Sequence, residues 1–391
     1  MKYNFDKVID RSGTSAEKVE GLKHIWGRTD LIPLWVADMD FATAPFVTDA
    51  IRKRCENEVL GYTGKPDSYY NAIINWVKQR YDLIVTKEVI NFVPGIVPGI
   101  GMAMNCFTQK GDKAMIQPPV YHPFAWVTTR NERTLVINPL KWENGMYRMD
   151  LDAFREQIKG CKLFILCNPH NPGGVVWTEA ELRAIADICY DEKVLVFSDE
   201  IHADLTLPPH THRPFATVSE KARMNSVTFM SPSKAFNMPG LSASHALIFN
   251  EDLRKRFRIY MDAGELDMGH VFAFLSVEAA YSHGTEWLDQ CLAYIQGNID
   301  FVDEFLKKHA PKIKAIRPEA SYLVWLDCRE LELSQKDLNE FFVDKAHLAL
   351  NDGEMFGKEG IGFMRLNVAS PRCIIEKAMK QLADAYQLYI K

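Results

Sequence analysis

Short apolar runs alternate with helical patterns between about residue 110 and residue 250, and this alternation is the strongest constraint on the fold. A nearly continuous apolar run suits a strand that is buried on both faces, as strands are in parallel sheets covered by helices. The expected strands are residues 113–117, 134–138, 162–167, 194–198, 226–230 and 244–249. Helical patterns such as residues 151–159 and 178–191 separate them. The chain is therefore predicted to have an α/β fold with a largely parallel, doubly covered sheet.

The pattern changes after about residue 285. A long amphipathic helix expected at residues 286–309 precedes short strand-like runs, and a further helix closes the chain. This mixed order is typical of a separate α+β unit, and 391 residues are enough for two domains. We therefore expect a large domain at residues 46–284 and a small α+β domain at residues 285–391, with residues 1–45 packed against the small domain.

Composition and charge exclude several classes of protein. The formal net charge is -5 and 25% of the residues are charged, so neither nucleic acid nor an anionic membrane is an expected partner. The first residues lack the apolar core of a signal peptide, and no apolar run reaches the ~20 residues that a membrane helix needs. The eight cysteines are scattered without CxxC spacing, which indicates reduced thiols. We therefore expect a cytoplasmic protein without a metal site.

Polar side chains follow three consecutive expected strands. Asn168 and Asn171 come after the expected strand at residues 162–167, and Asp199 closes the one at residues 194–198. Lys234 follows the expected strand at residues 226–230. Because ligands of open α/β sheets bind outside the carboxyl ends of the strands, these side chains are expected on one rim. Taken singly, Asp199 could be a helix cap and Asn171 a turn residue, but their joint placement favours a binding site.

A lysine amine opposite a buried carboxylate is what pyridoxal 5′-phosphate (PLP) requires of a protein. Lys234 would form an imine with the cofactor aldehyde, for which its pKa must be lowered. Asp199 would keep the pyridine nitrogen protonated. Asn171 and His202 are the nearest candidates to donate to the O3′ phenolate of the cofactor.

The cofactor phosphate needs hydroxyl groups and backbone amides. Ser231 and Ser233 lie beside the lysine, and a loop containing Gly95 leads into an apolar helix. A helix N-terminus is a ready site for a phosphate. The spacing of that loop fits neither a P-loop nor a dinucleotide fingerprint.

Six segments extend these observations to a family. The chain resembles fold-type-I PLP enzymes of the class I/II aminotransferase superfamily over essentially its whole length, and within them the MalY/PatB-type cystathionine β-lyases. The segments that carry this resemblance are residues 33–41 (PLWVADMDF), 61–62 (GY), 167–174 (CNPHNPGG), 198–205 (SDEIHADL), 231–237 (SPSKAFN) and 365–369 (RLNVA). The resemblance implies a mostly parallel seven-stranded sheet in the large domain and PLP as the cofactor.

The resemblance also implies roles for residues that the spacing alone does not single out. Tyr121 would stack on the cofactor ring and belong to the catalytic set, and Ile96 and Val97 would offer backbone amides to the phosphate. Asn168 would join Asn171 among the cofactor contacts. Tyr62 would reach the phosphate of the neighbouring subunit, which implies a homodimer with composite sites.

The substrate contacts implied by the resemblance are Arg365, Asn171 and the backbone at Ala37, with Arg365 binding the α-carboxylate bidentately. Taken alone, Arg365 would more often be a surface ion-pair residue. Two departures from the general aminotransferase pattern favour the lyase branch. No arginine follows the lysine at residues 238–244, and His202 stands where many relatives have tyrosine.

The predicted reaction is β-elimination from cystathionine or a related cysteine S-conjugate, which releases a thiol, pyruvate and ammonia. Lys234 would take the proton from the substrate Cα. Amino transfer to a 2-oxo acid is the alternative outcome of the same first step. A regulatory protein that uses PLP and binds a macromolecular partner is a further alternative from another class.

Overall fold

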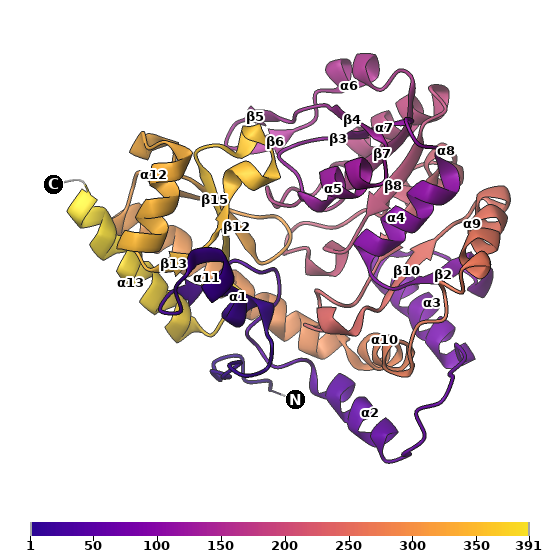
Figure 1. Ribbon diagram of the computed structural model, residues 1–391, viewed down its shortest axis with the longest axis horizontal. Helices are drawn as coiled ribbons and strands as arrows, with labels where there is room; N and C mark the ends of the chain where they lie inside the picture. Colours follow the sequence, from indigo (N-terminus) through magenta and orange to yellow (C-terminus); the bar gives the residue numbers. More distant parts are fainter. Residues whose placement is uncertain (1, 390–391) are drawn as a thin grey trace.

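The computed structural model describes residues 2–389 and shows two lobes that meet along one side (Figure 1). The larger lobe is built on a seven-stranded sheet in which β10 runs antiparallel to both neighbours and the other strands are parallel. In sheet order the strands are β2 (Ile90–Val93), β10 (Ser244–Leu247), β9 (Ser226–Met230), β8 (Leu195–Asp199), β7 (Cys161–Cys167), β3 (Lys113–Ile116) and β4 (Thr134–Ile137). The predicted fold class is therefore confirmed.

Both faces of this sheet are covered by helices. Because side chains alternate along a strand, Leu163 on β7 packs with α4 (Ile96–Phe107) while its neighbour Phe164 packs with α7 (Glu179–Asp191) on the other face. The core of α4 also includes α5 (Pro123–Arg130) and α9 (Glu251–Ala263), and that of α7 includes α6 (Leu151–Gln157) and α8 (Glu220–Met224). Burial on both faces explains why the strands read as continuous apolar runs.

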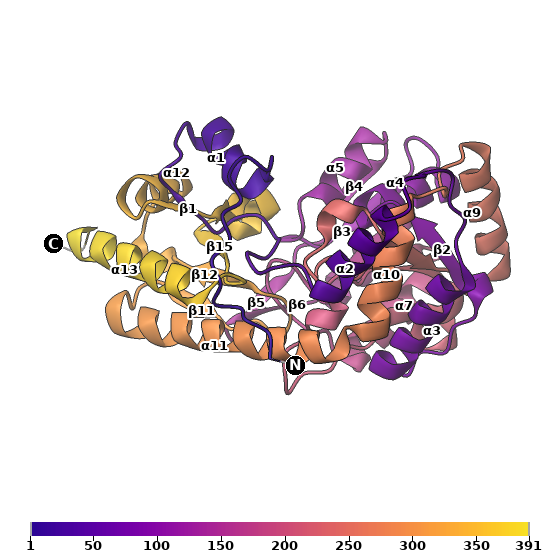
Figure 2. The same ribbon diagram turned by 90° about the horizontal axis from the view of Figure 1, so that it is seen from below.

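The largest core extends from one lobe into the other. Helices α2 (Pro45–Cys55), α3 (Asp67–Tyr81) and α10 (Val271–His283) pack together, and the rings of Trp76 and Tyr281 stack 5.0 Å apart. After α10 only Gly284 precedes α11 (Thr285–His309), which runs along the smaller lobe (Figure 2). The two lobes therefore share one continuous apolar interior.

The smaller lobe carries a four-stranded antiparallel sheet. Its strands in order are β11 (Lys314–Ile316), β12 (Leu323–Asp327), β15 (Phe363–Asn367) and β14 (Asn351–Asp352). Helices α11 and α13 (Arg372–Tyr389) pack against each other beside this sheet. Between β12 and β14 the chain forms α12 (Gln335–Glu340), which continues as a π-helical turn.

The N-terminal residues contact the smaller lobe. Helix α1 (Glu17–Trp26) precedes β1 (Ile32–Pro33), which pairs in parallel with β13 (Leu348–Ala349). The amide of Asn367 also donates to the carbonyl of Leu34 at 2.9 Å. The division of the chain at residues 45 and 284 stays a prediction. Across residues 2–389 the structure contains no helix with the length and apolar character needed to cross a membrane.

Candidate active site

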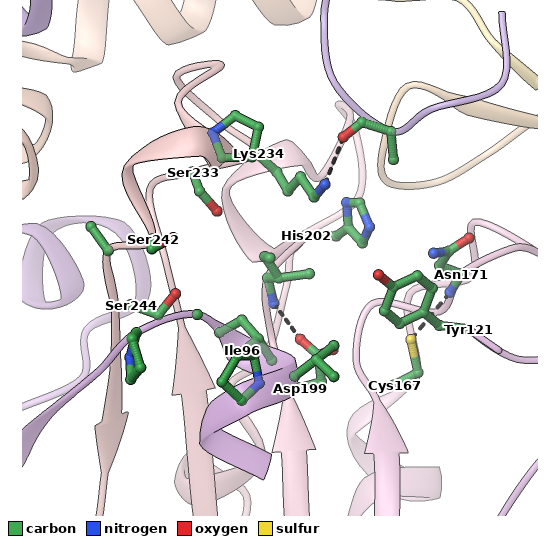
Figure 3. Close-up of a pocket in the computed structure, with 18 residues that line it drawn as sticks. Ile96, Tyr121, Cys167, Asn171, Asp199, His202, Ser233, Lys234, Ser242 and Ser244 are labelled. Atoms are coloured by element: carbon green, nitrogen blue, oxygen red, sulfur yellow. Dashed lines mark hydrogen bonds between the residues drawn. The ribbon is translucent and has the colours of Figure 1, made fainter. Parts of the chain in front are cut away.

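The carboxyl ends of β7, β8 and β9 and the N-terminus of α4 surround a cavity of about 280 Å³ (Figure 3). Polar residues from separate segments line it together, and among these described lining residues there is no arginine. The lining residues predicted from the sequence are Ala37, Gly95, Ile96, Val97, Tyr121, Asn171, Asp199, His202, Ser233 and Lys234. The strand-end rim expected for an α/β sheet is therefore where these side chains meet.

Lys234 lies in the turn that follows β9 and points its amine into the cavity (Figure 3). Its Nζ donates a hydrogen bond to the carbonyl oxygen of Ala37 at 2.6 Å. Burial lowers the pKa of Lys234 to about 8, although the negative charge of Asp38 opposes this effect. A useful fraction of the amine is therefore neutral, and nucleophilic, close to neutral pH.

Asp199 ends β8 and is 3% exposed. Its Oδ1 accepts a hydrogen bond from the amide of Ile201 at 3.0 Å, which is the one donor that the described residues give this carboxyl group. Burial raises the pKa of Asp199 to about 7, with the adjacent Glu200 acting in the same direction. A cationic nitrogen in the cavity would satisfy the free oxygen and keep the carboxylate ionised.

The N-terminus of α4 faces the same cavity. Gly95 caps the helix with φ +114°, and the first-turn amides of Ile96 and Val97 have no acceptor within the helix. A side chain at Gly99 would lie 2.9 Å from Val93 and 3.1 Å from Phe229, so glycine allows the helix to sit close to the sheet. These amides and the hydroxyl of Ser233 line the cavity together, and such groups are suited to bind an anion.

Two predicted cofactor contacts lie behind the cavity wall. The hydroxyl of Ser231 is 2.8 Å from that of Ser233 and donates to the carbonyl of Ala243 at 2.7 Å. The side-chain amide of Asn168 donates to the carbonyl of Arg213 at 3.1 Å. Both residues hold neighbouring loops in this structure, and a direct contact with a cofactor stays a prediction.

The side of the cavity opposite Ser233 carries an aromatic ring and neutral polar groups (Figure 3). Burial raises the pKa of Tyr121, so its hydroxyl stays protonated. The backbone amide of Asn171 donates to Cys167 Sγ at 3.3 Å. Burial lowers the pKa of His202 to about 3, and its Nδ1 has no hydrogen-bond partner within residues 2–389. His202 is therefore a neutral imidazole.

Arg365 lies on β15 just outside these lining residues and is 3% exposed. Its guanidinium donates to Asn171 Oδ1 at 3.0 Å, to the carbonyl of Trp35 at 3.2 Å and to Asn351 Oδ1. It also lies 4.8 Å from the ring centre of Phe356. Burial lowers its pKa to about 10, and its hydrogen-bond partners among the described residues are all neutral oxygens. A buried guanidinium held by neutral oxygens is suited to bind the carboxylate of a substrate.

Tyr62 is not brought to this cavity. Its side chain is 99% exposed in a segment without regular structure, where Val59 and Leu60 are also exposed. The contact of Tyr62 with a neighbouring site stays a prediction.

The residues present fit PLP. The cavity offers an amine of lowered pKa, a buried carboxylate in need of a cation, and a helix N-terminus for the phosphate. Each of these three groups lacks a complete set of partners in the chain itself, and one ring with an aldehyde, a pyridine nitrogen and a phosphate would supply all three.

Comparison with known proteins agrees with this geometry. Residues 29–382 match the model of the family described as aminotransferase class I and II, and the chain belongs to that family. The family predicted from the sequence is therefore confirmed.

Individual relatives are similar to nearly the whole chain. Cystathionine beta-lyase PatB of Bacillus subtilis is 38% identical over 384 residues, which cover 98% of this chain and 99% of that protein. Cystalysin from Treponema denticola, whose crystal structure contains PLP, superposes with a TM-score of 0.96 at 33% identity over 100% of both chains. The PLP-bound C–S lyase of Staphylococcus hominis has a TM-score of 0.91 at 35% identity over 98% of each chain.

Some lining residues had no predicted role. Cys167, Ile201, Pro239 and the segment from Ser242 to Ser244 contribute to the cavity. Cys167 and Ile201 lie beside predicted site residues, so adjacency could have indicated them. Residues 242–244 approach because β10 runs antiparallel beside β9, and the sequence carried no sign of that direction.

Proposed function

We propose that this protein is a PLP-dependent carbon–sulfur β-lyase that cleaves L-cystathionine or a related cysteine S-conjugate. The observation that carries the proposal is that Lys234 and Asp199 line one cavity, beside the guanidinium of Arg365, which is held by neutral oxygens. The lyase branch is supported by the names of the relatives, since cystathionine beta-lyase PatB aligns over nearly the whole chain.

Each group of the chain has a task in this reaction. PLP, when bound, supplies an electron sink for the pair of electrons left at the substrate Cα. Arg365 holds the α-carboxylate through two parallel hydrogen bonds, and Asp199 keeps the ring nitrogen protonated. The neutral amine of Lys234 takes the proton from Cα and becomes an ammonium group. Tyr121 would lie against the ring, and His202 and Asn171 would offer donors near its phenolic oxygen.

The leaving group on Cβ decides the outcome. In elimination the Cβ–S bond breaks and sulfur keeps its electron pair and gains a proton, so cystathionine and one water give homocysteine, pyruvate and ammonia. In amino transfer the Cβ–S bond stays intact, and a 2-oxo acid is required to accept the amino group. Both outcomes use the same site residues, so product analysis separates them.

The test is incubation of the purified enzyme with PLP and L-cystathionine, without any 2-oxo acid. We expect pyruvate and homocysteine in equal amounts. Lys234→Ala should abolish their release, whereas Lys336→Ala, at a side chain that is 84% exposed, should not change it. Product formation that depends on an added 2-oxo acid would instead establish the aminotransferase alternative.

We also propose that two copies of the chain form the working enzyme, with the partner's Tyr62 completing each site. The exposure of Tyr62, Val59 and Leu60 supports this proposal because isolated proteins rarely leave such a run of apolar side chains uncovered. The test mixes Tyr62→Ala and Lys234→Ala, each of which should be inactive alone, and lets their subunits exchange. The mixture should regain about a quarter of wild-type activity, since half of the dimers would hold one copy of each variant and therefore one intact site. No recovery of activity would refute shared sites.

A cytoplasmic location of the protein also stays a prediction.

A further inference from the structure

One wall of the cavity, residues 36–41, has no regular secondary structure; we call it the wall segment. Ala37 faces the active-site cavity, whereas Asp38, Met39 and Phe41 line a second hollow on the other side. An irregular stretch of backbone between two hollows has N–H and C=O groups that are not hydrogen-bonded within a sheet or a helix. One backbone bond holds it, from the amide of Asp40 to the carbonyl of Ala369 at 2.8 Å, and side chains of other elements hold the rest.

Asn367 at the end of β15 provides one anchor. Its Nδ2 donates to the carbonyl oxygens of Val36 at 2.6 Å and Asp38 at 2.7 Å, and its Oδ1 accepts from the amide of Ala369 at 2.8 Å. Both amide protons are thus used on the two residues that flank Ala37. Because alternate residues of a strand share a face, Asn367 projects to the same side of β15 as Arg365.

Asn237 provides the second anchor, three residues after Lys234. Its Nδ2 donates to the carbonyl oxygens of Met39 at 3.0 Å and Phe41 at 2.7 Å, and its Oδ1 accepts from the Met39 amide at 3.0 Å. Its backbone lies in the left-handed region with φ +53°, which asparagine tolerates. The wall segment is therefore tied to the strand of Arg365 at one end and to the loop of Lys234 at the other.

The carbonyl of Ala37 lies between these anchors and faces two donors. Lys234 Nζ donates to it at 2.6 Å and the hydroxyl of Tyr322 at 2.9 Å. With Val36 and Asp38 held on either side, this oxygen has little freedom to turn away from the amine.

We propose that Asn367 and Asn237 are positioning residues, which fix the wall segment so that the Ala37 carbonyl orients the free amine of Lys234 for proton transfer. The proposal rests on the proposed function, in which that amine takes the proton from the substrate Cα. A fixed acceptor beside Nζ favours the ammonium form that this step produces and restricts the amine to one approach.

No charged side chain around the amine is hydrogen-bonded to the side chain of Asn367. The charged or titratable side chains that face Lys234 are Asp38, Asp199, His202, Tyr322 and Arg365. Asp38 is itself held by Arg11 at 2.6 Å and by Lys18 at 3.7 Å. A change in the ionisation of Lys234 in an Asn367 variant would therefore report on the Ala37 carbonyl.

The test compares Asn367→Leu with Asn298→Leu. Asn298 is a matched control because it is also 0% exposed and its Nδ2 also donates to two carbonyls, those of Val368 and Ser370, both at 2.9 Å. Loss of either amide should lower unfolding stability to a similar extent. We expect Asn367→Leu alone to lower kcat, by about 10- to 100-fold with KM changed less than about threefold, because a misplaced amine slows the proton step.

A second readout needs no turnover. The rate at which the cofactor-free protein takes up PLP, followed by absorbance against pH, reports the fraction of neutral amine at position 234. Its midpoint should lie near pH 8 in the wild type, where the pKa of Lys234 is about 8. In Asn367→Leu it should fall by about one pH unit, since a loosened acceptor stabilises the ammonium less.

Equal effects of Asn367→Leu and Asn298→Leu on kcat, or an unchanged midpoint in Asn367→Leu, would overturn the proposal. Should Asn367→Leu fail to fold, Asn237→Gly takes its place, because glycine keeps the left-handed backbone and removes only the amide. The same fall in midpoint is expected there, and its absence refutes the proposal. These outcomes stand apart from the lyase assignment, which the products of the wild-type enzyme decide.

Discussion

Replacing Asp199 by Asn should stabilise the cofactor-free protein at neutral pH while it disables the site. Burial raises the pKa of Asp199 from 3.8 to about 7, so ionising this carboxyl group costs the folded state more than the unfolded state. At 1.36 kcal/mol per pH unit, that difference amounts to about 4 kcal/mol of unfolding free energy. Asn has nearly the same shape and keeps an oxygen for the Ile201 amide.

The sign follows from which state holds the proton. Between pH 4 and pH 7 the folded chain keeps a proton on Asp199 that the unfolded chain has lost, so this group lowers wild-type stability as pH rises. The penalty is complete above about pH 7 and absent below about pH 4. Buried histidines such as His170 and His202, whose pKa values are lowered to about 3, give the opposite trend in the same range. Both proteins share the histidines, so their difference isolates Asp199.

The assay is urea unfolding of both cofactor-free proteins between pH 4 and pH 8. The stability of Asp199→Asn minus that of wild type should grow from near zero to about 4 kcal/mol. Added PLP should then stabilise the wild type and not the variant. Asp204→Asn is the control, since burial also raises the pKa of Asp204 but its partners are Trp76 and Tyr81, away from the cavity. A stability difference that does not vary with pH would refute the reasoning.

Three further substitutions follow from the structure. Arg365→Lys should raise KM for the amino-acid substrate about 10- to 100-fold in steady-state assays, because an ammonium group cannot bind the carboxylate bidentately; an unchanged KM would exclude the carboxylate role. Gly174→Ala should lower the free energy of unfolding, measured in urea, by about 2 kcal/mol or more, since φ is +69° and the new Cβ would lie 2.5 Å from Pro318. Gly99→Ala should weaken PLP binding about tenfold in an absorbance titration, because α4 must shift from the sheet; equal affinity would refute the helix-end phosphate site.

The sheet was predictable because burial on both faces left apolar runs that local sequence reveals. Strand β2 was not predicted, because its run of four residues, Ile90–Val93, is short and is followed directly by a Pro-Gly turn, as a loop segment could be. The direction of β10 was also hidden, since antiparallel pairing within a buried sheet leaves the same apolar run as parallel pairing.

The site was predictable where chemistry and strand ends coincide, as at Asp199 and Lys234. Arg365 could be assigned only by family resemblance, because its surroundings include Trp35 and Asn171, which are far from it in sequence. Asn367 lies in the segment 365–369 that carries the family resemblance, but it was given no role of its own for the same reason. Its two acceptors lie more than 300 residues away along the chain, and local spacing carries no trace of such a contact.

Helix α11 links the two lobes and sets a further requirement on the chain. Its 25 residues run without interruption from Gly284, which lies close to Phe236 in the turn that carries Lys234, along the smaller lobe that carries Arg365. Each residue of an α-helix advances the chain by about 1.5 Å and rotates it by about 100°. A single inserted residue would thus swing the carboxylate-binding strand away from the lysine while leaving every reactive group intact. The number of residues in this helix is consequently as much a determinant of activity as the identity of any side chain in the cavity.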